Sequence, residues 1–215
     1  MKTLLDNEFV RSKGIRVGAV VCKSATKTGH FVLVDEVACR QCIPFFHDTC
    51  DKEVLKIHAT NPVIIIEHER FIKDLQAECG GVCDYLLYDD NKIAFVDLRC
   101  GLSQYLQIHK KEGIPMEGKK ATARRQIEAS IERMYKNPDI ATYIDAFSNK
   151  TGILGYRNRD DELFTDCPET INQVEDVSLA FMRELEERQL IMSLSHGFSF
   201  MMIRYPQIYE FGSEE

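Results

Sequence analysis

Two aspartates and an arginine stand close together in the sequence, at the ends of a predicted β-hairpin. Two apolar runs flank the polar tetrad 89–92, which predicts the turn. Asp84 opens the first strand and Asp97 closes the second. Arg99 follows two residues later, on the same face of its strand as Asp97. Since antiparallel pairing joins these strand ends, the two carboxylates could converge on one divalent cation beside a positive charge. Such a group can hydrolyse phosphodiesters.

The elements around this hairpin are expected to hold it within an α/β fold. Residues 62–66 are a continuous apolar run, which predicts a strand buried on both faces. Residues 67–78 suit one or two helical turns, and residues 151–157 suit a strand. The best helix is expected over residues 119–135, because its apolar residues recur every three or four positions. These residues are Ala123, Ile127, Ile131 and Met134.

The remaining sequence predicts additions before and after this core. The expected elements are a hairpin of residues 15–22 with 30–35, a short helix over 51–58, a polar loop over 101–118, helices over 138–147 and 177–189, and one or two strands within 191–205. We therefore divide the chain into three parts. Residues 1–50 are an extension with a hairpin and a cysteine-rich loop, residues 51–157 are the core, and residues 158–215 are a helix–strand addition.

The order of these elements resembles the PD-(D/E)xK nuclease superfamily. In that superfamily an aspartate begins one strand, an acidic-x-Lys triplet ends the next, and a helix packs behind them. Here Asp84, Asp97 and Arg99 stand at the corresponding positions, within residues 60–157. The resemblance implies a mixed central sheet flanked by helices, a restriction-endonuclease-like core, and hydrolysis of nucleic acid with Mg²⁺ or Mn²⁺.

The resemblance also implies roles for residues outside the hairpin. Gln126 matches a glutamine that some of these nucleases carry on the following helix. Glu67 or Glu69 would be the additional acid that many members bring from an upstream helix to the metal. The chain departs from the family at three places, where Cys83, Arg99 and Ser130 replace proline, lysine and tyrosine. An arginine stabilises negative charge but does not readily act as a base, since it stays protonated.

Composition and charge narrow the classes of partner. The chain has 215 residues, and its formal net charge is −7. An acidic protein binds nucleic acid only through a local basic patch, a metal or a basic partner. The densest basic region is the predicted helix 119–135, preceded by Lys110 and Lys111. Its basic residues are Lys119, Lys120, Arg124, Arg125 and Arg133. The other interpretation of this helix is an ordinary solvated face with ion pairs to neighbouring glutamates.

The N-terminus lacks a signal-peptide core, and no apolar run approaches the roughly 20 residues that a membrane-spanning helix needs. We therefore expect a cytoplasmic protein without a membrane span. Eight cysteines in such a setting are expected to be mostly free thiols. The spacing of Cys39, Cys42, His47 and Cys50 also allows a structural zinc site. Buried or surface thiols are the interpretation that we favour.

Two functions follow from the sequence. The first is a Mg²⁺-dependent endonuclease-like protein, with Asp84 and Asp97 as ligands and Arg99 as the charge stabiliser. The second is a nuclease-like subunit without activity that binds a protein, a second copy of the chain, or RNA. Arg99 separates the two, since loss of the family's lysine is how a degenerated site would look. The sequence contains none of the Walker A, GxSxG or HExxH motifs of other enzyme classes.

Overall fold

The computed structural model describes residues 1–34, 53–75, 81–101, 109–111, 114–158 and 192–212. These residues form a mixed α/β structure around one eight-stranded sheet. Seven strands follow one another across the sheet, and β10 (Ile208–Phe211) lies beside β2. The seven strands are, in order, β1 (Ser24–Val34), β2 (Glu53–Glu67), β3 (Tyr85–Tyr88), β4 (Lys92–Gly101), β7 (Asn149–Asn158), β9 (Ser199–Arg204) and β8 (Met192–Ser193).

The pairing between neighbouring strands changes from antiparallel to parallel at β4. Strands β1 to β4 pair antiparallel, whereas β4, β7 and β9 pair parallel. A parallel pair requires a crossover connection, usually a helix. Between β4 and β7 this crossover contains α4 (Lys119–Tyr135) and α5 (Pro138–Asp145). The predicted order of hairpin, long helix and strand is therefore confirmed, as is the mixed sheet.

Helix α4 forms where its apolar periodicity predicts it. Its buried residues include all four of the predicted stripe, together with Ser130. Helix α5 begins at a local signal, because the side chain of Asn137 accepts hydrogen bonds from the backbone of Asp139 and Ile140. Pro138 occupies the first helical position, where no backbone donor is needed.

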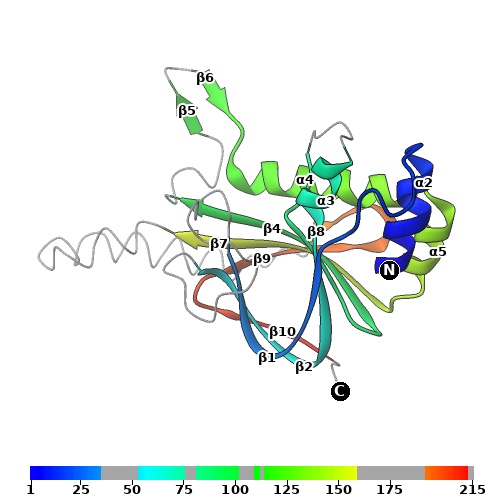
Figure 1. Ribbon diagram of the computed structural model, residues 1–215. Coiled ribbons are helices and arrows are strands. Elements are labelled where there is room, and N and C mark those ends of the chain that lie inside the picture. Colours follow the sequence, from blue (N-terminus) through cyan, green and yellow to red (C-terminus); the bar gives the residue numbers. More distant parts are fainter. Residues whose placement is uncertain (35–52, 76–80, 102–108, 112–113, 159–191, 213–215) are drawn as a thin grey trace, which may run out of the picture.

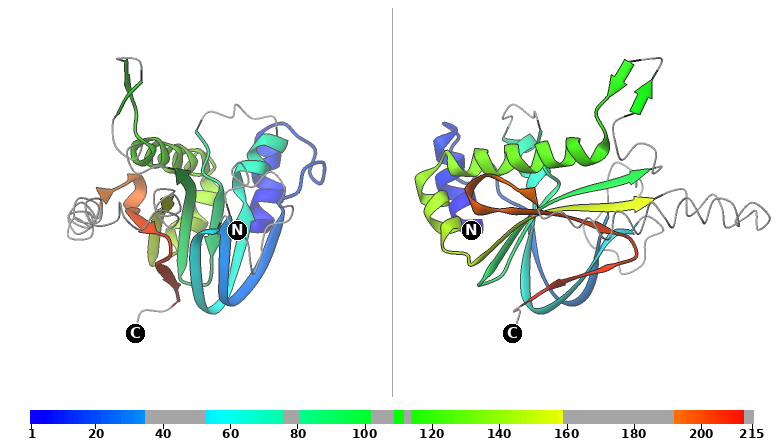
Figure 2. Two further views of the ribbon diagram at one scale, coloured as in Figure 1. Left: turned by 90° about the vertical axis from the view of Figure 1, so that its left-hand side faces the viewer. Right: turned by 180° about the vertical axis from the view of Figure 1, so that it is seen from behind.

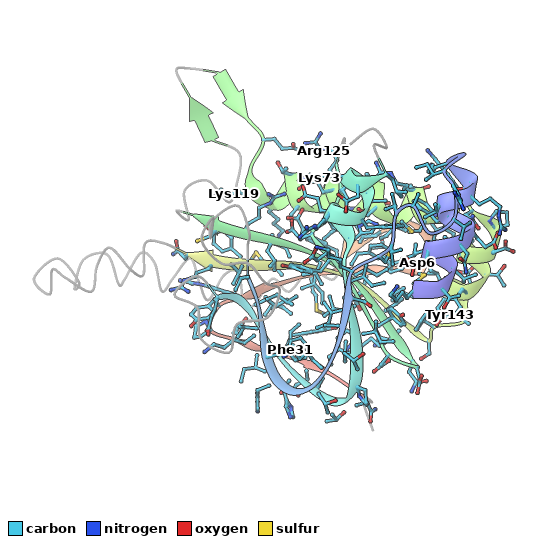
Figure 3. All side chains as sticks on the ribbon, in the orientation of Figure 1. Asp6, Phe31, Lys73, Lys119, Arg125 and Tyr143 are labelled. Carbon is cyan, nitrogen blue, oxygen red and sulfur yellow. The ribbon has the colours of Figure 1, made fainter. Side chains whose placement is uncertain are left out.

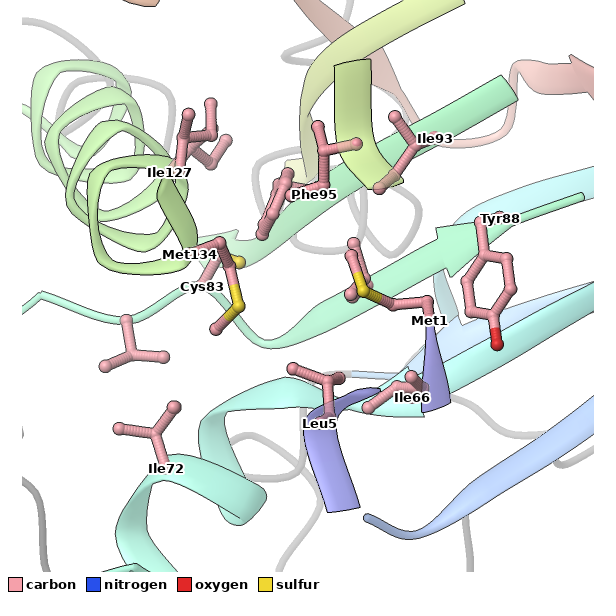
Figure 4. Packing of buried hydrophobic residues seen from close by; sticks show 14 of the residues in the cluster. Met1, Leu5, Ile66, Ile72, Cys83, Tyr88, Ile93, Phe95, Ile127 and Met134 are labelled. Carbon is pink, nitrogen blue, oxygen red and sulfur yellow. The ribbon is translucent and has the colours of Figure 1, made fainter. Parts of the chain in front are cut away.

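Helices cover one face of the sheet in the described part of the chain (Figures 1 and 2). They comprise α4, α5, α3 (His68–Asp74) and a helical N-terminal segment, made of α1 (Lys2–Leu4), a π-helical turn Leu5–Phe9 and α2 (Val10–Ser12). Figure 4 shows part of this core, with Leu5, Ile72 and Ile127 from the helical segments and Ile93 and Phe95 from β4. This helix-covered core depends on all four helical segments.

The opposite face is closed by the sheet itself. Strand β2 is long, and its first half curls with β1 and β10 beneath the central strands (Figure 1). The buried cluster on this side comes entirely from strands, for example Leu55, Leu87, Val96 and Phe211. At Gly155 of β7 a Cβ atom would lie 2.7 Å from Leu98 Cδ2 and 3.1 Å from Leu55 Cβ, so a larger residue would require these buried side chains to shift.

The structure corrects three predicted elements. The predicted helix over 51–58 is wrong, because β2 is already extended from Glu53. Residues 15–22 form turns rather than a strand, and β1 pairs with β2 instead. The predicted loop 101–118 contains a small two-stranded sheet, β5 (His109–Lys111) with β6 (Ile114–Met116). In each case the conformation follows from pairing with a strand that is distant in the sequence or that was not predicted.

Other predictions are confirmed only in their coarser form. The strand within 62–66, the helix after residue 67 and strands within 191–205 are present. The predicted helix 177–189 lies outside the described residues. Strands from all three predicted parts of the chain share the single sheet. Among the described helices, none is both long enough and apolar enough to cross a membrane.

Candidate active site

The hairpin of β3 and β4 places Asp84 opposite Asp97. Tyr85 pairs with Val96 in the antiparallel register, so the next residues outward are the two aspartates. The turn at the other end is fixed by Asp89, whose Oδ1 accepts backbone hydrogen bonds from Asn91 and Lys92 at 2.8 and 2.7 Å. The predicted hairpin and its turn are therefore confirmed.

Both carboxylates belong to the helix-covered face. Side chains alternate along a strand, and Phe95 of β4 packs into the helix-covered core. Asp97 and Arg99 follow at intervals of two residues and so share that face. Leu86 of β3 packs into the same core, which assigns Asp84 to this side as well.

Asp97 is buried and paired with Arg99. Its side chain is only 1% exposed, and Arg99 Nη2 lies 3.0 Å from Oδ1 and 3.0 Å from Oδ2. The same guanidinium nitrogen donates to Oε1 of Gln126 on α4. Arg99 itself is 27% exposed, so its guanidinium lies between the buried carboxylate and solvent. The structure thus brings together Asp97, Arg99 and Gln126.

Asp84 is held by backbone contacts on both sides. Its Oδ2 accepts a hydrogen bond of 2.6 Å from the backbone N–H of Leu98, the residue after Asp97. Its backbone carbonyl accepts hydrogen bonds from His68 and Glu69, at 2.9 and 3.2 Å. The first turn of α3 is therefore attached directly to the start of the hairpin.

The two candidate auxiliary acids differ in position. Glu67 ends β2 opposite Tyr85, and its buried side chain lies 3.5 Å from Arg70 Nη1. Its backbone is thus one strand away from Asp84 and next to it in register. The carboxylate of Glu69 is instead paired with Lys73 at 2.8 Å on α3. Ile65, two residues earlier, and the pairing partner Tyr85 both belong to the cluster on the opposite face of the sheet, so the strand geometry directs the Glu67 side chain away from the face of Asp84 and does not favour it as a further ligand.

A small polar cluster supports the hairpin from behind. Ser130 of α4 accepts a 3.0 Å hydrogen bond from the backbone N–H of Cys83 and donates one of 2.9 Å to the carbonyl of Gln126. Ser130 thereby links the backbone of Gln126 to the residue that precedes Asp84. Sequence reasoning gave Ser130 no role, although its place among the buried positions of the helix was a usable signal.

His68 and Cys83 complete this cluster as neutral groups. His68 Nδ1 lies 3.4 Å from the Cys83 sulfur and 3.4 Å from its carbonyl oxygen. Burial, followed by the charge of Arg133, lowers the pKa of His68 to about 3. Burial raises the pKa of the Cys83 thiol well above its usual value, and the charges of Asp97 and Asp84 raise it further. A hydrogen bond with Ser130 acts in the opposite direction and only partly offsets this rise. The pair is therefore unsuited to nucleophilic attack.

The donor chemistry of the site suits a hard cation. Asp84 and Asp97 offer carboxylate oxygens, and Mg²⁺ is commonly held by one or two carboxylates together with substrate phosphates. In the described part of the chain, no group of three or more His, Cys, Asp and Glu side chains is arranged to hold a metal by itself.

The predicted zinc ligands Cys39, Cys42, His47 and Cys50 lie outside the described residues. Of the cysteines that the structure describes, Cys22, Cys83 and Cys100 are free thiols.

The predicted basic region is partly engaged in contacts within the protein. Arg125 is 68% exposed and pairs with Glu117 at 2.8 Å, and Arg124 donates to the carbonyl of Ser193. Lys119 lies where α4 begins, above the end of β4 (Figure 3). Its Nζ donates a 2.6 Å hydrogen bond to the carbonyl of Cys100. Lys119 therefore lies beside the end of β4, while Arg133, further along the helix, lies close enough to His68 to lower its pKa.

Comparisons of this chain with known protein families, with curated proteins and with solved structures found no match.

Proposed function

We propose that this protein hydrolyses phosphodiester bonds of nucleic acid with Mg²⁺ or Mn²⁺, at Asp84 and Asp97. The observation that supports it most is the opposition of these two aspartates across one antiparallel pair, with Arg99 and Gln126 beside Asp97. The proposal also agrees with the resemblance of residues 60–157 to PD-(D/E)xK nucleases.

Each residue has a role that its position supports. Asp84 and Asp97 would hold the cation. A bound divalent cation supplies charge neutralisation at the phosphate and a more acidic water. Arg99 stabilises the negative charge that develops on the phosphate, because its guanidinium carries a permanent charge and reaches solvent. Gln126 fixes the direction of that guanidinium.

One observation favours a second candidate function, a nuclease-like subunit that binds a partner without cleaving. The guanidinium of Arg99 already contacts both oxygens of Asp97, so it competes with a cation for this carboxylate. A site of this kind would retain its shape and its surface charge while having lost hydrolysis. Cleavage assays separate the two candidates.

The experiment is cleavage of single- and double-stranded DNA and RNA with Mg²⁺ or Mn²⁺, with and without a chelator. We expect chelator-sensitive cleavage by the wild type and none by Asp97→Asn, which keeps the shape of the side chain and removes the ligand charge. Asp90→Asn is the matched control, since Asp90 lies at the turn on the far end of the same hairpin and should cleave like the wild type.

Cleavage that persists in Asp97→Asn would exclude this active site. A wild type that cleaves no substrate with either metal, and yet binds a partner, would favour the second candidate.

A further inference from the structure

Besides Arg99, a second cation lies at this end of β4: the ammonium group of Lys119, from α4. It occupies the side-chain position of Gly101, in line with Asp97 and Arg99. These three residues of β4 are two apart, so their side-chain directions share the helix-covered face. A Cβ atom built on Gly101 would lie 2.0 Å from Nζ of Lys119. The ammonium group of Lys119 therefore takes the place that a side chain at residue 101 would fill.

The backbone around this position is fixed from two sides. Lys119 Nζ donates to the carbonyl of Cys100 at 2.6 Å, and the hydroxyl of Tyr156 on β7 donates to the carbonyl of Gly101 at 2.8 Å. The contact at residue 101 is with the end of a flexible side chain, so a larger residue there would displace the ammonium group. The glycine thus leaves room for the charge in its present position.

The result is a row of charges along one strand: the carboxylate of Asp97, the guanidinium of Arg99 and the ammonium of Lys119. Alternate residues of a strand are about 7 Å apart. The first turn of α4 contains no acidic residue that would oppose the row. Two successive cations beside a carboxylate suit an extended anion with repeating charges. A nucleic-acid strand is such an anion, whereas a single phosphate is not.

We propose that Lys119 binds the phosphate adjacent to the one that Arg99 contacts, so that the site takes a polynucleotide strand rather than a small phosphodiester. This inference rests on the proposed function for the place of Arg99. Lys119 is assigned to substrate binding and has no part in bond cleavage.

The test is binding of fluorescein-labelled single-stranded oligonucleotides, as DNA and as RNA, in Ca²⁺ and over a series of salt concentrations. Lys119→Met removes the charge and keeps the stem. Gly101→Ala keeps the charge and displaces it. Lys120→Met is the matched control, because it removes the neighbouring charge in the same helical turn. Thermal unfolding of each variant verifies that it is folded.

We expect Lys119→Met to weaken binding roughly tenfold, as for loss of one hydrogen bond to a charged group. The slope of log affinity against log salt should fall by about 0.7, the value for one phosphate contact on a single strand. Gly101→Ala, if folded, should show the same direction, and Lys120→Met should change affinity less than twofold.

A Lys119→Met affinity equal to that of Lys120→Met would overturn the assignment, and so would a wild type that binds neither oligonucleotide. If the binding contrast holds but no substrate is cleaved, the hydrolysis proposal fails while the assignment of Lys119 stands.

Discussion

Strand β4 carries a cation near each of its ends, and the two are held in different ways. Lys92, at the start, is 6% exposed, and its Nζ lies 4.7 Å from the ring centre of Tyr209 and 5.4 Å from that of Phe211. It also donates to the carbonyl of Glu210. Arg99, near the other end, is paired with a carboxylate and reaches solvent.

This difference separates a structural charge from a charge that is available to a ligand. Aromatic faces attract a desolvated ammonium and exclude water from it, so Lys92 serves to attach β10 to the sheet. The guanidinium of Arg99 keeps access to solvent beside a buried carboxylate. The closed end of the strand should therefore govern stability, and the open end should govern chemistry.

The largest expected effect is at the open end. Asp84→Asn should reduce cleavage about 100-fold or more, because it removes a ligand charge from the proposed cation. The amide oxygen can still accept the hydrogen bond from Leu98, so the melting temperature should stay within a few degrees of the wild type. Metal-dependent cleavage and thermal unfolding measure the two quantities. A large loss of stability in this variant would contradict the division between the two ends.

Acid should lower the free energy of unfolding through His68, which lies in the polar cluster that supports the hairpin. The pKa of His68 is about 3 when folded, against an ordinary value of 6.5, so the unfolded chain binds more protons between these values. The free energy of unfolding therefore decreases as pH falls, by about 1.5 kcal/mol between pH 6.5 and 5 from this residue. Urea unfolding at several pH values measures the slope, which should be shallower in His68→Leu. An unchanged slope in that variant would place the acid sensitivity elsewhere.

At the closed end, Lys92→Ala should lower the free energy of unfolding by about 2 kcal/mol. The variant loses both the packing of the buried stem and the attraction of the ammonium to the two rings. Lys92→Met keeps the stem and should lose less. Cleavage by both variants should stay within about twofold of the wild type, as measured below the unfolding transition. Loss of cleavage in a folded Lys92→Ala would show that the two ends are coupled.

The smallest effect is expected from Arg99→Lys. Lysine is the residue of the PD-(D/E)xK pattern at this position, and its single ammonium orients water more freely than a guanidinium. Cleavage should therefore be retained or rise slightly, whereas Arg99→Ala should lose most of it. Initial rates at saturating metal measure both. A strong loss in Arg99→Lys would show that contact with both Asp97 and Gln126 is essential.

Local signals were sufficient for the hairpin and for the long helix. Asp89 fixes the turn with its own side chain, and the alternation beyond it sets the register that opposes Asp84 and Asp97. The apolar stripe of α4 decides both its length and the face that it buries. These features depend on residues close in sequence, so the sequence could predict them.

Features that depend on distant partners could not be predicted in the same way. Residues 53–59 are extended because β1 and β10 pair with them from both sides. Pro62 is tolerated within β2 because it lies where the pairing with β1 shifts register, between Lys27 and Gly29. The contact of Gln126 with Arg99, and the place of Lys119 at Gly101, require the docking of α4 on β4.

The pairing of β10 with β2 determines when the strand-built core can form during synthesis. Its side chains His58 and Glu210 meet at 2.7 Å although 152 positions separate them. Tyr209 and Phe211 belong to the strand-built cluster, so this cluster stays incomplete until the last strand has left the ribosome. The helix-covered cluster includes Phe198 and Phe200, so it too stays incomplete until residues close to β10 have been made. Both faces of the sheet should therefore expose apolar surface to chaperones while the preceding residues are translated.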